Sequence, residues 1–269
     1  MRLSFIFILS LVSALLTDAK GQGFSVSPSR LVFSGSSGET VSQSITFSNN
    51  SPTVLSFINR IQDWDRDSLG NKSYYDGGTK PQSNAKWINL SSNSVEIQPG
   101  ETKQVIVSLN IPAGAKTLTH SMIFFTQVKQ QQSEQTKGTS IGINVLMEVG
   151  VQVYYAPKGL DAGDFEFLAF DDHGITEQNG VKIRTLALKI HNRGDINKDA
   201  TVKFELTNKE TGEEIKLAPQ IIAMLPDATQ WVLMKIPANL KGKFLAVGLL
   251  DAGSTYDLKV AEKEITYSP

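Results

Sequence analysis

The segment Ser140–Tyr155 (SIGINVLMEVGVQVYY) constrains the fold of this chain more than any other, because it alternates in polarity along its length. Its odd-numbered residues from Ile141 to Val153 are all apolar, whereas most of its even-numbered residues are glycine or polar. Successive side chains of a β-strand point to opposite faces of a sheet, so the pattern predicts one long strand with a continuous apolar face. We find no heptads and no long amphipathic helix elsewhere in the chain.

Shorter runs repeat this alternation on both sides of the long segment. Turn-forming residues separate the runs, as in Asn49-Asn50-Ser51-Pro52 and Gln98-Pro99-Gly100. Many short strands at such spacing are typical of antiparallel β-sandwiches, so the predicted fold class is all-β. The expected strands span residues 24–33, 41–48, 54–64, 104–111, 121–128, 165–170, 181–191, 200–207, 230–236, 243–250 and 260–267.

The alternation breaks at Ala156-Pro157-Lys158-Gly159. Proline cannot continue a central strand, and glycine adds backbone freedom. We therefore expect two immunoglobulin-like β-sandwich domains in tandem, residues 23–156 and 157–269, joined by a short linker.

Residues 1–22 have the layout of a secretory signal peptide. Met1 and Arg2 give a positive start, an apolar run follows from Leu3 to Leu16, and small and polar residues come next. At a rise of ~1.5 Å per residue this run spans about 21 Å, less than the ~30 Å hydrocarbon core of a bilayer. The sequence therefore predicts export, with cleavage between Ala19 and Gly23.

Composition excludes several kinds of site. The chain has no cysteine, which excludes disulfides, thiolate metal ligands and thiol nucleophiles. Only three histidines are present, and the formal charge of -1 argues against nucleic acid as the main partner. We predict no cofactor, no metal site and no catalytic residues, so the protein is not expected to be an enzyme.

Three weaker signals favour ordinary structure over chemistry. Asp63, Asp65 and Asp67 fit the start of a calcium loop, but Ser68 and Tyr74 stand where that loop needs glycine and glutamate, so a solvated loop is the simpler interpretation. His173 and His191 are expected to be surface residues or hydrogen-bonded structural ones and not catalytic bases, because the sequence places no partnered acid with them. The polar segments 65–86 and 129–139 are expected to be irregular and mobile.

Several motifs of the first predicted domain resemble, in order, those of the periplasmic pilus-assembly chaperones (PapD-like). Ser29–Gly35 (SRLVFSG) resembles their first strand, and Val41–Pro52 their second strand and its asparagine-rich turn. Ser121–Phe125 resembles a later strand, and the alternating strand that ends in Tyr154-Tyr155-Ala156-Pro157 resembles their last strand and its exit. The resemblance covers roughly residues 24–157.

This resemblance implies a mechanism of partner binding. In that family the last strand donates alternating apolar side chains to a subunit that lacks one strand, here Ile141, Ile143, Val145 and Met147. Two basic residues in the interdomain cleft anchor the carboxylate at the end of the subunit. Arg30 matches the first of them, whereas Gln152 stands at the position of the second and carries no charge.

The sequence leaves alternatives open for these residues. Any sandwich edge strand with one buried face would alternate as this one does, and Arg30 could be a structural arginine. The resemblance implies a periplasmic chaperone of pilus, fimbrial or other surface subunits. The alternative is a structural or adhesive two-sandwich component of a cell-surface assembly. In either case the edge at 141–147 would allow self-association.

Overall fold

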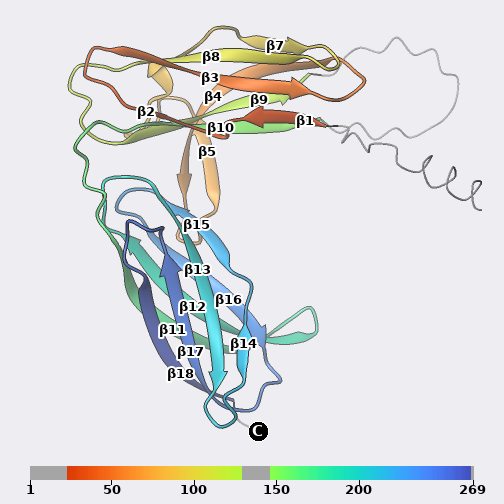
Figure 1. Ribbon diagram of the computed structural model, residues 1–269, viewed down its shortest axis with the longest axis vertical. Coiled ribbons are helices and arrows are strands. Elements are labelled where there is room, and N and C mark those ends of the chain that lie inside the picture. Colours follow the sequence, from red (N-terminus) through yellow and green to blue (C-terminus); the bar gives the residue numbers. More distant parts are fainter. Residues whose placement is uncertain (1–22, 129–145, 268–269) are drawn as a thin grey trace, which may run out of the picture.

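The computed structural model describes residues 23–128 and 146–267, and their regular structure is β apart from one 3₁₀ turn, η1 (Ala85–Trp87). The strands form two β-sandwiches that follow one another along the long axis of the molecule (Figure 1). The prediction of an all-β fold with two sandwiches in tandem is confirmed. The predicted signal peptide, 1–22, lies outside the described residues.

The first sandwich encloses its core between two sheets, and the buried side chains of that core come from β-strands, except Ile111, which follows β8. Phe47, Phe57 and Phe125 are fully buried at its centre, with Val151 and Val153 of the last strand beside them. One sheet has the order β1 (Phe24–Ser27), β3 (Thr40–Asn49), β8 (Thr102–Asn110), β6 (Ile88–Leu90). The other has the order β2 (Arg30–Phe33), β10 (Glu148–Tyr155), β9 (Thr119–Gln127), β4 (Leu55–Arg66), β5 (Lys72–Asp76), with β7 (Ser94–Ile97) on the far end of β4.

The first predicted strand, 24–33, is divided between these two sheets. Its first half, β1, pairs with β3, and its second half, β2, pairs with β10 on the opposite side of the core. The chain crosses at Ser27-Pro28, where proline has no N–H to give to a ladder. Because of this crossing, β2 begins too late in the chain to pair with the whole length of β10.

The second sandwich packs a three-stranded sheet on a five-stranded one around Leu188, Val202 and Phe204. The three-stranded sheet has the order β11 (Phe165–Gln178), β12 (Val181–Asn192), β16 (Thr229–Pro237). The other has the order β14 (Glu214–Lys216), β13 (Lys198–Asn208), β17 (Gly242–Asp251), β18 (Lys259–Tyr267), with β15 (Gln220–Met224) also on β13. The division of strands falls between Tyr155 and Phe165; the exact domain limits, 23–156 and 157–269, remain a prediction.

The prediction that 65–86 is irregular is wrong for 65–66 and 72–76, which are strand, whereas 77–84 has no helix or strand. β4 continues to Arg66 and turns back as β5, which forms a hairpin whose cross-strand pairs include Trp64 with Tyr74 and Arg66 with Lys72. The Asp67 carboxylate closes the turn by accepting hydrogen bonds from the backbone N–H groups of Leu69 and Asn71, at 2.8 and 2.9 Å. The polar sequence of this segment did not predict a hairpin. The hairpin is ordered by contacts of its cations with an aromatic ring, Arg66 and Lys72 with Trp64, and not by a run of apolar residues.

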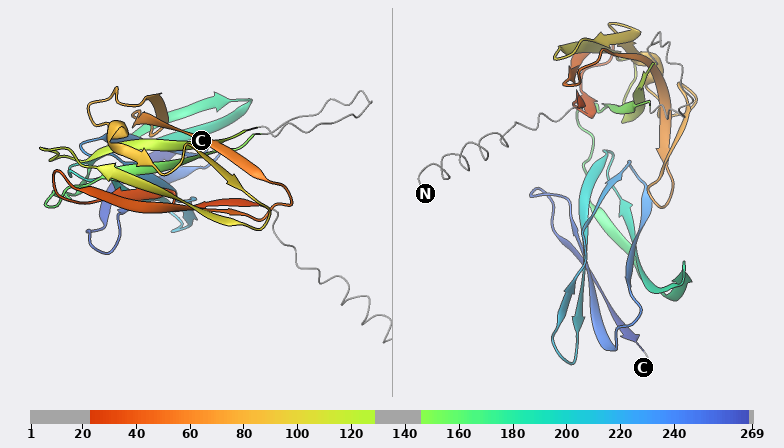
Figure 2. Two further views of the ribbon diagram at one scale, coloured as in Figure 1. Left: turned by 90° about the horizontal axis from the view of Figure 1, so that it is seen from above. Right: turned by 90° about the vertical axis from the view of Figure 1, so that its right-hand side faces the viewer.

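The β4–β5 hairpin also reaches the second sandwich (Figures 1 and 2). The N–H of Trp231 on β16 donates a 2.7 Å hydrogen bond to the carbonyl of Ser68 at the hairpin tip. Gly70 has a positive φ of 84° and lies so near that a β-carbon there would come within 2.4 Å of the Gln230 side chain. An apolar cluster joins the sandwiches beside this contact; it contains Trp64, Leu118, Met122, Phe124, Tyr154 and Leu225.

Within 23–128 and 146–267, no helix has the length and apolar character needed to cross a membrane.

Candidate partner-binding site

Strand β10 is paired along only half of one edge. On one side β9 pairs with all of Glu148–Tyr155. On the other side β2 pairs only with Gln152–Tyr155, and its ladder ends where the Gln152 N–H donates to the Ser29 carbonyl at 3.0 Å. No other described strand pairs with β10 on that side, so the backbone groups of Glu148–Val151 have no ladder partner at this edge.

The apolar face of β10 becomes more exposed towards the start of the strand, the end where its edge is unpaired. Val153 and Val151 are fully buried, Val149 is partly buried, and Met147 is 38% exposed. The strand itself begins at Glu148, later than the sequence pattern predicted. Ile141, Ile143 and Val145 lie outside the described residues, so the exposed apolar ridge remains a prediction for them. Met147, the fourth residue of the predicted ridge, is exposed as expected.

Arg30 and Gln152 lie side by side where the open edge ends. They are register partners in the parallel β2–β10 ladder, as the sequence comparison with the chaperone family led us to expect. The Gln152 side chain accepts a 2.8 Å hydrogen bond from the Tyr154 hydroxyl and adds no charge. A segment added to the open edge would therefore meet one cation, Arg30, as it reaches the covered half of β10.

Arg30 is held by the second sandwich. Its guanidinium donates to both carboxylate oxygens of Asp199 on β13, at 2.8 and 3.2 Å, and lies 5.6 Å from the centre of the Tyr154 ring. The hydrogen bond to Asp199 raises the pKa of Arg30, and both side chains remain partly exposed, 33% and 48%. The Tyr154 hydroxyl also lies 3.4 Å from Asn197, the residue before β13. This pair thus connects the two sandwiches at the candidate site.

Sequence reasoning missed two further cations on the same sheet. Arg66 and Lys72 are cross-strand partners in the β4–β5 hairpin, and both lie over the ring of buried Trp64, at 5.5 and 5.1 Å from its centre. The Trp64 ring in turn lies 6.1 Å from Tyr154, the ring beside Arg30. One signal for them was present in the sequence, in a segment that looked like a loop. An aromatic residue and a cation stand two positions apart twice, as Trp64 and Arg66 and as Lys72 and Tyr74.

Asp63 is buried and hydrogen-bonded, so the prediction of a solvated loop is wrong for this residue. Its buried carboxylate accepts hydrogen bonds from the backbone N–H groups of Gly78, Thr79 and Lys80 and from the hydroxyls of Ser83 and Ser121. Burial by itself would raise the pKa of Asp63, but these hydrogen bonds lower it below its ordinary value. The described residues contain no group of His, Asp and Glu side chains suited to a metal ion.

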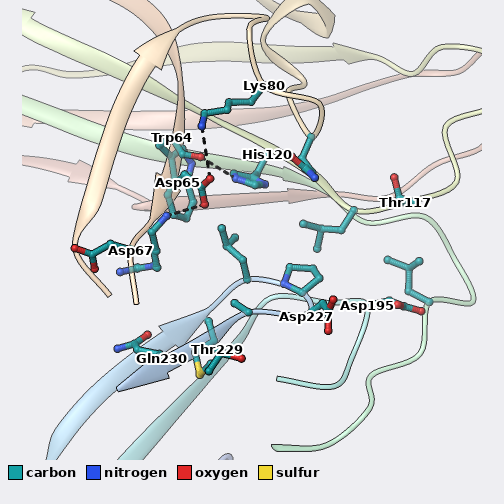
Figure 3. Close-up of a pocket in the computed structure, with 18 of the residues that line it drawn as sticks. Trp64, Asp65, Asp67, Lys80, Thr117, His120, Asp195, Asp227, Thr229 and Gln230 are labelled. Carbon is teal, nitrogen blue, oxygen red and sulfur yellow. Dashed lines mark hydrogen bonds and ion pairs between the residues drawn. The ribbon is translucent and has the colours of Figure 1, made fainter. Parts of the chain in front are cut away.

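A cavity of about 660 Å³ lies between the sandwiches, on the side of the hairpin where Asp65 and Asp67 project (Figure 3). Its walls include the Trp64 and His120 rings from the first sandwich and the turn around Asp227 from the second (Figure 3). The Nε2–H of His120 donates a hydrogen bond to the Trp64 carbonyl, 3.0 Å away, and burial lowers the pKa of His120. Arg30 and Gln152 do not line this cavity.

His191 differs from the prediction made for it. Its Nε2 lies 2.9 Å from the Asp227 carboxylate, so the expectation that no acid accompanies it is wrong. The contact joins the end of β12 to the turn before β16, and Asp227 is almost fully exposed. Such an exposed pair ties two neighbouring segments together at the surface.

No family model matches the sequence, and no curated protein matches it. Among solved structures, the chain is similar to the YadV chaperone, with a TM-score of 0.48 and 9% identity over 90% of this chain and 99% of that one. It is also similar to the CsuC–CsuE chaperone–tip subunit complex of Acinetobacter baumannii, with a TM-score of 0.47 and 13% identity over 89% and 97%. The E. coli chaperone DraB gives a TM-score of 0.44 and 14% identity over 90% and 98%.

Proposed function

We propose that this protein is a periplasmic chaperone that binds pilus, fimbrial or other surface subunits by adding a strand at the open edge of β10. The observation that carries the proposal is that edge: β2 covers β10 only from Gln152 onward. An exposed strand edge invites pairing with other chains, and proteins normally protect it. An edge left open beside an alternating apolar segment is suited to a partner that covers both.

Strand addition divides affinity and specificity between backbone and side chains. The N–H and C=O groups of Glu148–Val151 supply ladder hydrogen bonds, which are indifferent to the sequence of the partner. Apolar side chains at every second position select a complementary apolar groove on the partner. They are Met147 and, by the sequence pattern, Ile141, Ile143 and Val145.

The end of the open edge sets where the partner segment ends. Arg30 lies there, next to Gln152, and its planar guanidinium suits a carboxylate. In the pilus chaperones that the sequence resembles, this position anchors the carboxylate at the end of the subunit. The role proposed for the protein needs export, for which residues 1–22 supply the signal peptide; the cell surface is the alternative location.

A structural or adhesive component is the second candidate, since an open edge pairs as well with a second copy of the chain. The two functions differ in stoichiometry. A chaperone releases its subunit and is absent from the mature assembly, whereas a structural component stays in it.

The test compares Ile143→Asp with Asn144→Asp, which places the same charge on the other face of the predicted strand. Both variants are purified from the native envelope, and the polypeptides that co-purify are identified and quantified. We expect Ile143→Asp to lose the partner and Asn144→Asp to retain it, with unfolding in urea unchanged in both. If Ile143→Asp lowers the free energy of unfolding by roughly 3 kcal/mol or more, the segment is ordinary core. Recovery of the wild-type protein in mature fibres would favour the structural component.

A further inference from the structure

Two buried polar side chains in the wall of the cavity between the sandwiches have hydrogen-bonding groups without partners in the described part of the chain. His120 on β9 is 7% exposed, and Gln230 on β16 is 8% exposed. The Nε2–H of His120 donates to the Trp64 carbonyl, whereas its Nδ1 has no partner among residues 23–128 and 146–267. The side-chain amide of Gln230 makes no hydrogen bond within the same residues. Buried polar groups are normally hydrogen-bonded, so two such groups beside one cavity point to a ligand.

The free nitrogen of His120 determines the kind of group that the ligand must offer. Because Nε2 carries the proton, Nδ1 is a hydrogen-bond acceptor. Burial lowers the pKa of His120, so the ring is neutral at neutral pH and keeps this lone pair. Figure 3 shows the ring on the cavity wall, facing the turn of the second sandwich that carries Asp227. The ligand therefore needs a hydroxyl or an N–H group at this point.

The charged groups around the cavity disfavour an ionic ligand of either sign. An anion or a cation would meet repelling charges as well as attracting ones, and it would lose its hydration on entering. A hydroxyl group both donates and accepts, so it matches either kind of wall group without carrying a charge. The charged wall residues are Asp65, Asp67, Asp195 and Asp227 against Arg66, Lys80 and Lys116.

The rest of the wall is largely apolar and comes from both sandwiches. Leu118 lies on the side of the first sandwich, and Leu225 and Pro226 lie on the side of the second. The cavity volume of about 660 Å³ is typical of small-molecule sites, which often form between domains. A sugar ring offers the matching combination, since it carries hydroxyl groups around an apolar C–H face.

We propose that this cavity is a binding site for an uncharged mono- or disaccharide. A sugar hydroxyl donates to Nδ1 of His120, another contacts the amide of Gln230, and the C–H face of the ring packs against Leu118 and Leu225. Because these groups belong to two sandwiches, the bound sugar holds the sandwiches together. The site is separate from the open edge of β10 and does not depend on strand addition.

The sugar is unidentified, so the probes are D-glucose, D-galactose, N-acetyl-D-glucosamine and maltose, with glucosamine and glucuronate as charged matches of glucose. Each is titrated into the full-length mature protein while NMR follows the Nδ1 resonance of His120, which responds to a hydroxyl that donates to it. We expect a saturable shift with at least one neutral sugar, with a Kd below about 10 mM. The two charged sugars should bind at least about tenfold more weakly than the best neutral one.

Three variants assign the site, and calorimetry measures their binding of the best neutral sugar. His120→Phe keeps a planar ring but removes the acceptor, so it should abolish binding. Thr117→Val removes an exposed cavity hydroxyl and should weaken binding about three- to tenfold, the scale of one neutral hydrogen bond. Thr255→Val, in an exposed turn before β18 and outside the cavity, is the matched control and should bind as wild type. Urea unfolding checks that each variant folds, and Gln230→Leu replaces His120→Phe if that variant does not.

Three results would overturn the site. The first is that no neutral sugar shifts the His120 resonance at concentrations up to about 100 mM. The second is equal binding by Thr117→Val and Thr255→Val. The third is tighter binding of glucosamine or glucuronate than of every neutral sugar, which would assign the cavity to a charged ligand. Ile143→Asp should bind sugar as wild type does, so failure of strand addition is separable from failure of this site.

Discussion

The two halves of β10 share one alternating sequence but have different surroundings. Gln152–Tyr155 has a partner strand on each edge and buried residues on both faces, whereas Glu148–Val151 has one partner strand and a face that becomes exposed towards Met147. Alternation alone therefore does not separate core from binding edge. The length and starting point of the neighbouring strand, β2, make the distinction.

The largest effect that this comparison predicts is on stability. Val153→Asp forces a charge into the fully buried half and should cost the first sandwich roughly 4 kcal/mol or more. Met147→Asp places the same charge on the exposed end and should change the free energy of unfolding by less than about 0.5 kcal/mol. Urea unfolding followed by tryptophan fluorescence measures both, in a Trp231→Phe background that leaves only signals from the first sandwich. Equal losses from the two variants would contradict the division of β10.

A smaller effect concerns the hydrogen bonds that the Asp63 carboxylate accepts beside the covered half of β10. Asp63 accepts a hydrogen bond from Ser121, the register partner of Val153, and its pKa lies below its ordinary value of 3.8. A carboxyl group with a lowered folded-state pKa stabilises fully above its unfolded pKa, and the stabilisation is lost as the pH falls through the folded value. Wild-type stability should therefore decline below about pH 4.

Asp63→Asn isolates this contribution from other carboxylates. The variant should be less stable than wild type by about 1–3 kcal/mol at neutral pH, and the difference should shrink on acidification. Urea unfolding at a series of pH values measures it. A difference that stays constant down to about pH 2 would show that the Asp63 charge is not involved.

The smallest effect is expected at the open half. Glu148 pairs with Arg60, whose two terminal nitrogens lie 2.6 and 2.9 Å from its oxygens, but both side chains are well exposed. Glu148→Gln should therefore cost less than about 1 kcal/mol, and the cost should fall further at high salt. The same unfolding experiment at low and high salt tests this. A larger loss would mean that the open half is held more firmly than its single partner strand suggests.

Much of this fold could be predicted from sequence because the alternation is local. The faces of Val151 and Val153 follow from parity within the strand, and the position of Arg30 beside Gln152 followed from the family resemblance. The β4–β5 hairpin could not be predicted in this way, since its residues are polar and their order comes from contacts with Trp64 and with the second sandwich.

The sequence by itself determined that this chain is a β protein, which face of each strand is apolar, and that its first segment resembles an export signal. Only the tertiary structure decided which part of β10 keeps an open edge, which carboxylate holds Arg30, and which cations gather near it. The physical reason is distance along the chain. Arg30 and Asp199 are 169 residues apart, and a pairing between such positions depends on how two sandwiches pack and not on any local pattern.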